Sequence, residues 1–298
     1  MLLSGILYGF GAAFSQSSSY FFSKSFLEKF RGNSLLLLIY GHLAMGLIAV
    51  IIFPFLIPFD FPEISEFLPE MLLATLFYLG GQITLFSSLR YSDASRVSPL
   101  LGMKIFVLAL IKLLFFDSQI NGLQWGAVAL SVSAAFLLSL TGGRMDRRSV
   151  YWIAGACVSY SLSDINIRIF VDNFSEAGIF KSSLIGVCLI YTLCGAVSLI
   201  ALSFLKTRPS GAFRKAFPFG AAWLTGMIFL FACFASIGVV FGNIIQSTRG
   251  VISILAGATL SKLGYESIEK KTPAGIVFKR SMAALLMWAA IILYYIGV

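Results

Sequence analysis

Three charged residues stand inside long apolar stretches of the sequence: Lys104, Asp164 and Arg249. A charge near the middle of a membrane-spanning helix costs roughly 2.5–3.5 kcal/mol on insertion scales, so such residues usually mark a solute or ion pathway. Two cations against one acid leave a positive balance that a phosphate or carboxylate group would complete. The chemistry that these residues suggest is therefore the binding of a small anionic or zwitterionic solute.

Other polar side chains are spaced to share helix faces with these charges. Asn243, Gln246 and Arg249 recur every three residues and predict one polar stripe. Tyr160 precedes Asp164 by one helical turn. In the first and third spans, polar residues likewise share a helix face. The predicted solute-binding set is Ser15, Tyr78, Gln82, Lys104, Tyr160, Asp164, Asn243, Gln246 and Arg249.

Each charge also has a purely structural interpretation, which the sequence leaves open. Lys104 can form a buried ion pair with Asp164 instead of binding a solute. Asp164 can pair with Arg168 four residues on, or it can face a cavity where its protonation couples transport to a gradient. The stripe with Arg249 can serve interhelical hydrogen bonds, worth about 0.6 kcal/mol each. The same choice between cavity lining and helix packing holds for the polar residues of the first and third spans.

The elements that must position these residues are membrane helices. Hydrophobic residues make up 58% of the chain and charged residues 12%, with a mean hydropathy of +0.92, whereas soluble domains are about a quarter charged. Apolar runs of about 20 residues recur along nearly the whole length. The fold class is therefore an all-α polytopic membrane protein. The ten predicted transmembrane helices are 3–22, 34–57, 68–89, 94–116, 121–141, 150–171, 180–205, 217–238, 241–263 and 276–297.

Lysines and arginines predict the orientation of these spans. Of the 22 in the chain, most fall in alternate connections, and the positive-inside rule makes that side cytoplasmic. Both termini are then expected on the outer side of the cell inner (plasma) membrane. The same topology accounts for the net charge of +9 without a nucleic-acid partner. The basic connections carry Lys24, Lys29, Arg31, Arg90, Arg96, Arg144, Arg147, Arg148, Lys206, Arg208, Arg214, Lys215, Lys262, Lys270, Lys271, Lys279 and Arg280.

An internal repeat divides the chain in half. Asp117 and Gly126 match Glu266 and Gly275, and both pairs are 149 positions apart. Two repeats of five spans each must lie in opposite orientations, because five is odd. Inverted repeats are a recurring plan of transporters, with the solute site near the midplane at the repeat interface. The predicted repeats, which form one integral membrane unit, are 1–145 and 146–298.

Three motifs follow one another in the first half. They are Ser88-Leu89-Arg90-Tyr91-Ser92-Asp93-Ala94-Ser95, an apolar span that ends at Asp117, and Gln124-Trp125-Gly126. Their order and spacing resemble the drug/metabolite transporter superfamily, in its ten-helix EamA-type branch. The second half matches more loosely, through Leu263-Gly264-Tyr265-Glu266 and Gly275.

The resemblance implies a carrier that works by alternating access, with spans 1–4 and 6–9 around a central cavity. The chain departs from the family at Lys104, where members often carry a proline, and in the expected placement of the termini. The alternatives are proton-coupled efflux of amphiphilic or cationic compounds, and flipping of a lipid-linked anion. No sequence pattern of an enzyme, cofactor or metal site is found, and a monomer or a loose homodimer in the lipid bilayer is expected.

Overall fold

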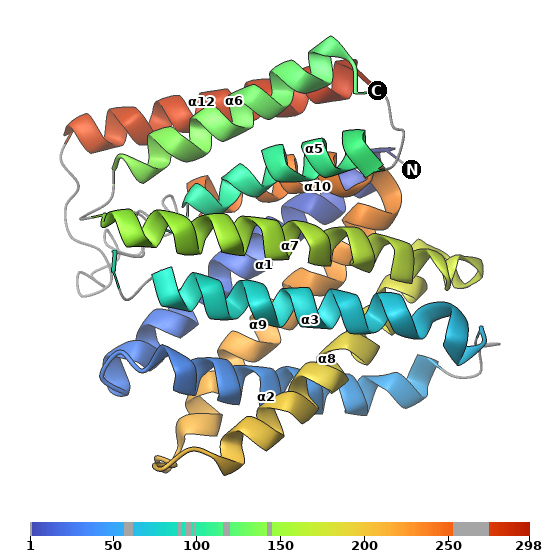
Figure 1. Ribbon diagram of the computed structural model, residues 1–298, viewed down its shortest axis with the longest axis vertical. Coiled ribbons are helices and arrows are strands. Elements are labelled where there is room, and N and C mark those ends of the chain that lie inside the picture. The colour runs from blue at the N-terminus through green and yellow to red at the C-terminus, as the bar shows by residue number, and fades with distance from the viewer. Residues whose placement is uncertain are drawn as a thin grey trace. The chain divides into compact units, whose positions relative to one another are not determined.

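The computed structural model describes residues 2–56, 62–88, 91–92, 97, 99–115, 120–141, 145–252 and 274–298, and regular structure within these ranges is entirely helical (Figure 1). Each predicted span contains a described helix. The motif residues at 89–90, 93–96, 117 and 263–266 lie outside the described residues. The helices are α1 (Leu2–Lys29), α2 (Ser34–Ile52) with η1 (Phe53–Leu56), α3 (Ile64–Ser88), η2 (Leu101–Met103), α5 (Lys104–Phe115), α6 (Gly122–Ser139), α7 (Arg147–Asp172), η3 (Ser175–Ala177), α8 (Ile179–Ser203), α9 (Ala212–Ile237), α10 (Val239–Gln246) and α12 (Ala274–Ile296).

Six stretches of the described chain are long and apolar enough to cross a membrane by themselves. Two other helices, α1 and α7, are equally long but carry polar runs such as Ser15–Ser19. Together these helices make the chain a multi-pass membrane protein, while crossing by all ten predicted spans stays a prediction. The six apolar stretches are Ser34–Leu56, Ile64–Ser88, Gly122–Ser139, Ile179–Ser203, Ala212–Ile237 and Phe278–Ile296.

The chain folds into two compact units, each assembled from an early and a late segment. Unit 1 comprises Met1–Leu79 and Ser163–Gly238, and unit 2 comprises Gly80–Leu162 and Val239–Val298. Both α3 and α7 contribute residues to each unit. The boundary between the predicted repeats, after residue 145, divides the chain differently from these compact units. It is drawn from the sequence pattern, and it stays a prediction.

Unit 1 is held together by helices that approach closely at glycines. Gly5 of α1 lies against Ile237 of α9, whereas Gly226 of α9 lies against Gln16 of α1, so these two helices run antiparallel. Helices α2 and α8 also approach closely through their backbones: a Cβ added to Gly46 would lie 2.8 Å from the Cα of Gly195. Without a hydrophobic drive between helices in lipid, such small-residue contacts supply the van der Waals packing.

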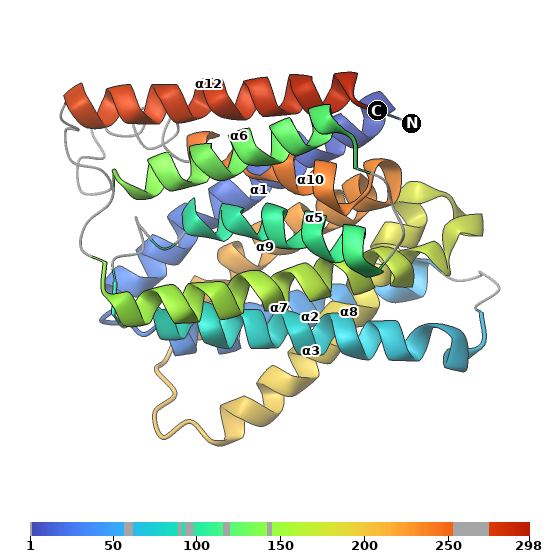
Figure 2. The same ribbon diagram turned by 45° about the horizontal axis from the view of Figure 1, so that its top comes forward.

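Unit 2 contains a second antiparallel pair, α6 and α12, which lie side by side in both ribbon views (Figures 1 and 2). At one end a Cβ on Gly126 would meet Leu293, 2.9 Å away. Further along, the two helices share a buried cluster. Its members are Ala134, Leu138, Ala283 and Met287, with Leu137, Val251 and Leu286 packed against them.

Two predicted spans contain a local irregularity in their helices. Span 94–116 contains the 3₁₀ turn η2, after which α5 begins, and span 241–263 contains α10, which ends at Gln246 before a turn at Ser247–Thr248. In the second case both hydroxyls donate to the carbonyl three residues back, at 2.6 and 2.7 Å. Such local bonds compete with the regular helix ladder and tighten the backbone.

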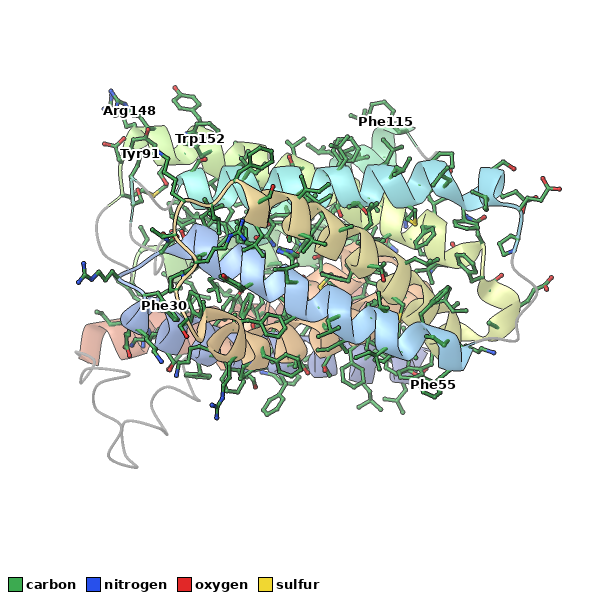
Figure 3. The ribbon with its side chains drawn as sticks, turned by 90° about the horizontal axis from the view of Figure 1, so that it is seen from below. Phe30, Phe55, Tyr91, Phe115, Arg148 and Trp152 are labelled. Atoms are coloured by element: carbon green, nitrogen blue, oxygen red, sulfur yellow. The ribbon has the colours of Figure 1, made fainter. Side chains whose placement is uncertain are left out.

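One end of unit 2 carries a group typical of a membrane interface. The Arg148 guanidinium lies 6.0 Å from the centre of the Tyr91 ring, and Trp152 lies beside them, as Figure 3 shows. Tyr91 and Trp152 are 40% and 39% exposed. Because tyrosine, tryptophan and arginine favour the headgroup level, this group fits the basic side predicted from the sequence.

Candidate functional site

Lys104 is the deepest charge that the structure describes in unit 2. Its side chain is only 8% exposed, and the residue is the first of α5, directly after η2. The backbone stays helical from Leu100 through Lys104, and the Lys104 N–H donates to the Leu101 carbonyl. The positive charge at this position therefore comes from the ammonium group.

The irregular backbone beside Lys104 is satisfied by the neighbouring helix α7. The Ser161 hydroxyl donates to the Lys104 carbonyl at 3.2 Å and to the Cys157 carbonyl at 2.7 Å. The Cys157 thiol donates to the Leu100 carbonyl at 3.7 Å. Irregular backbone at membrane depth persists only where other groups take up its hydrogen bonds, so α7 fixes the position at which α5 begins.

The structure brings Lys104 together with one other predicted site residue, Tyr160. The Lys104 Nζ lies 5.9 Å from the centre of the Tyr160 ring, within cation–π range. On its other side the ring packs against Gly81 of α3, where an added Cβ would lie 2.7 Å from it. Gly81 thus leaves room for the ring, and its neighbour Gln82 is 7% exposed.

The predicted polar stripe near Arg249 is interrupted. Asn243 and Gln246 are buried in α10, which packs against α5 and α12, and the Asn243 amide donates to the Val239 carbonyl at 2.8 Å. Arg249 is partly buried and begins the next helical stretch, beyond the turn that ends α10. A shared face for Asn243, Gln246 and Arg249 therefore stays a prediction.

Three predicted site residues belong to unit 1: Ser15, Tyr78 and Asp164. Ser15 is partly buried on α1, and Asp164 is 5% exposed on α7. Arg168, the proposed partner of Asp164, forms an ion pair with Asp172 instead, with 2.8 Å between Nε and Oδ2, and donates to the Phe234 carbonyl. Pairing of Asp164 with Lys104 would join the two units and stays a prediction.

Tyr78 takes part in a buried aromatic cluster that the sequence did not reveal. The His42 Nδ1 donates to the Leu38 carbonyl at 2.8 Å, so in the neutral ring Nε2 accepts from the Tyr78 hydroxyl at 3.0 Å. The Tyr191 ring stacks on His42, and the Trp223 indole donates to the Tyr191 hydroxyl at 3.3 Å. These residues come from four helices, and one signal was present: His42 and Tyr191 are 149 positions apart.

Replacing Tyr78 with phenylalanine should lower the melting temperature of the detergent-solubilised protein. The change removes the hydroxyl and leaves the buried His42 Nε2 without this donor, at a cost of about 1–3 kcal/mol. Tyr8→Phe is the matched control, because the described contacts of Tyr8 are ring contacts with Phe180 and Phe229. Equal melting temperatures for the two variants would contradict the assignment of this hydrogen bond.

Residues 3–140 match the model of the EamA-like transporter family. Residues 3–140 belong to that family. The EamA match confirms the resemblance drawn from the motifs and covers α1 to α6 and with them Lys104. The family is one of transporters, which implies a small-molecule solute and a lipid environment for its members. No curated protein matches the sequence.

The fold is also similar to that of a solved crystal structure of a protein. The TM-score is 0.68 at 13% sequence identity, and the alignment covers 98% of this chain and 96% of the other. The likeness thus extends over the half of the chain that lies beyond the EamA match. At this identity it shows the fold alone.

Proposed function

We propose that the protein carries a small anionic or zwitterionic metabolite across the cell inner membrane by alternating access. The observation that carries this proposal is Lys104, a buried cation that follows a 3₁₀ turn within its helical span. Ionisable residues inside membrane spans usually mark a solute or ion pathway. A buried lysine favours an anionic ligand.

The proposal includes ten spans arranged as two inverted repeats with a central cavity between them. A residue close to a two-fold axis contacts the equivalent residue of the other repeat. The sequence offset therefore predicts that such contacting residues are 149 positions apart. Gly46 and Gly195 differ by 149 and lie against each other. Their contacts are also reciprocal, because Gly46 faces the Tyr191 carbonyl and Gly195 faces the His42 carbonyl, again 149 apart.

The α6–α12 pair of unit 2 supports the same symmetry. Its buried cluster contains two sets of residues 149 positions apart, Ala134 with Ala283 and Leu138 with Met287. The antiparallel course of α6 and α12 is what an in-plane axis requires of equivalent helices. Two contacts in two units thus agree with the offset that the sequence motifs suggested.

A two-step experiment tests the proposed substrate class. The purified protein is screened for thermal stabilisation by organic phosphates, carboxylates, amino acids and lipophilic cations, since a ligand of the folded state raises its stability. Compounds that stabilise it are then followed for uptake into proteoliposomes, with protein-free liposomes as the control. Uptake of an anion or a zwitterion is expected. Stabilisation and uptake of lipophilic cations alone would overturn the proposal in favour of efflux.

The proposed orientation has its own measurement. Both termini are expected outside, since the basic connections define the cytoplasmic side. A cysteine-reactive or antibody label on a C-terminal tag should therefore react in intact spheroplasts. Reaction only after the membrane is opened would reverse the topology and leave the substrate class untouched.

A further inference from the structure

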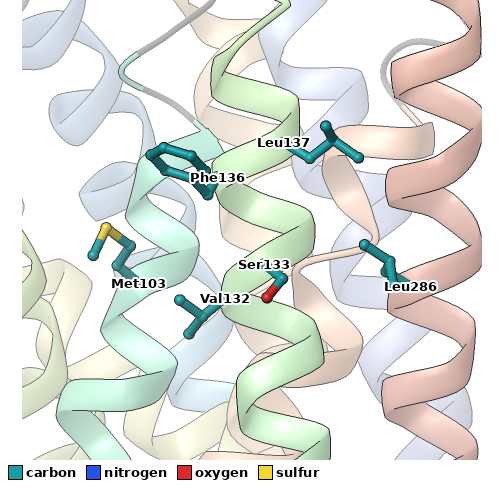
Figure 4. Close-up of a pocket in the computed structure, with 6 residues that line it drawn as sticks. All are labelled: Met103, Val132, Ser133, Phe136, Leu137 and Leu286. Carbon is teal, nitrogen blue, oxygen red and sulfur yellow. The ribbon is translucent and has the colours of Figure 1, made fainter.

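An apolar groove in unit 2 is lined by residues other than Lys104 and its neighbours on α7. Its volume is about 440 Å³, and Figure 4 shows Met103 of η2 on one side of α6 and Leu286 of α12 on the other. Met103 and Phe136 are 40% and 55% exposed, so the groove is open outward. Its lining consists of Met103, Val132, Ser133, Phe136, Leu137 and Leu286.

The chemistry of this lining excludes the proposed solute. A site for a polar metabolite needs several convergent polar groups, whereas here the Ser133 hydroxyl is the one polar side-chain group of the six. A hydrocarbon chain fits such walls. Because lipid tails are as apolar as leucine, however, a tail alone gains little by entering the groove. Any selectivity must come from charge at the end of the groove.

That charge is present on α12. Lys279 lies seven residues before Leu286, two helical turns and about 10 Å along the same face, with Met282 between them. Lys279 is exposed and Met282 is 38% exposed. Arg280 adjoins Lys279, and no acidic residue occurs in either α6 or α12. One exposed stripe of α12 thus runs from Lys279 to an apolar wall of the groove, and Arg280, the next residue, is partly buried.

We propose that unit 2 binds an anionic phospholipid here, with one acyl chain in the groove between η2, α6 and α12 and its phosphate at Lys279 and Arg280. The predicted topology places these two residues on the cytoplasmic side, where anionic lipids attract basic residues near the membrane. This inference concerns a lipid and not the transported solute, so of the proposed function it rests only on the orientation of the spans.

The test compares phosphatidylglycerol with phosphatidylcholine of identical chains, added to the full-length protein in neutral detergent. Native mass spectrometry should show at least fivefold more retained phosphatidylglycerol, and its addition should raise the melting temperature more. Lys279→Gln with Arg280→Gln should remove the difference between the two lipids. The matched control, Arg214→Gln with Lys215→Gln at the start of α9, should preserve it.

A second variant tests the groove itself. Ser133 is exposed on α6, so Ser133→Trp should fill the groove without disturbing the buried cluster, and retention of both lipids should fall. Equal binding of the two lipids by the wild type, or undiminished preference in the Lys279 and Arg280 double variant, would overturn the proposal. The proposal would also be overturned if Ser133→Trp converted a dimer of the protein into a monomer without any loss of bound lipid. The groove would then hold a second copy of the chain.

Discussion

Leucine in place of Gly46 should leave almost no folded, monodisperse protein after solubilisation. A Cβ at this position would lie 2.8 Å from the Cα of Gly195 and 3.1 Å from the Tyr191 carbonyl oxygen. Both obstacles are backbone atoms, so no side-chain rotation relieves the clash. Helices α2 and α8 would have to separate along their shared contact. Fluorescence-detected size-exclusion chromatography and a thermal melt measure the outcome.

Alanine at the same site gives a graded version of this result. Overpacking by a methyl group typically costs about 1–3 kcal/mol, so Gly46→Ala should lower the melting temperature by several degrees. Gly195→Ala should behave alike, because its Cβ would lie 2.9 Å from the Cα of Gly46. In the double variant the melting temperature should fall by less than the sum of the two single decreases, since one separation of the helices accommodates both methyl groups.

Gly122 is the matched control for these substitutions. It begins α6, and no atom lies within 4 Å of the position that a Cβ would occupy. Gly122→Ala should therefore keep or slightly raise the melting temperature, because alanine favours the helix over glycine. Wild-type behaviour of Gly46→Leu would contradict the described contact between α2 and α8, and with it the reciprocal pairing that supports the repeat.

Much of the helical layout could be predicted from hydropathy alone. Apolar runs set the ranges of α2, α6 and α8 within a few residues, because lipid requires about 20 apolar residues in each span. The 3₁₀ turn at Leu101–Met103 and the turn after Gln246 could not be predicted in this way. A 3₁₀ turn and an α-helix bury the same apolar side chains, and what decides between them here is hydrogen bonding by hydroxyl and thiol groups.

The candidate site was predicted in part for a related reason. Lys104 could be predicted because a charge within an apolar run is recognisable from the amino-acid sequence alone. Its contact with Tyr160 was not predicted, because it depends on the register between α5 and α7 and on the space that Gly81 leaves. The His42 and Tyr191 cluster was missed because uncharged aromatic residues are common in membrane spans. Only the repeat offset connects those two residues in the sequence.

Replacing Lys104 with methionine should weaken transport of the anionic solute by about 10- to 100-fold in KM. A charge-assisted hydrogen bond is worth about 1.5–3 kcal/mol, and each 1.4 kcal/mol is a factor of ten. Methionine keeps most of the side-chain volume, so packing against Tyr160 is retained while the charge is lost. Lys104→Arg should preserve more of the uptake than Lys104→Met, because it keeps the cation. Initial uptake rates in proteoliposomes measure both.

Lys112→Met is the matched control, since it removes the same charge two turns later on α5, where the residue is only partly buried. It should leave KM unchanged. The structural alternative makes a different prediction: if Lys104 only balances Asp164, then Lys104→Met lowers the melting temperature and adding Asp164→Asn restores it. In that case solute-induced stabilisation should survive in the double variant. Under the proposed function Lys104→Met abolishes solute-induced stabilisation, and Asp164→Asn does not restore it, because the solute has lost the cation that binds it.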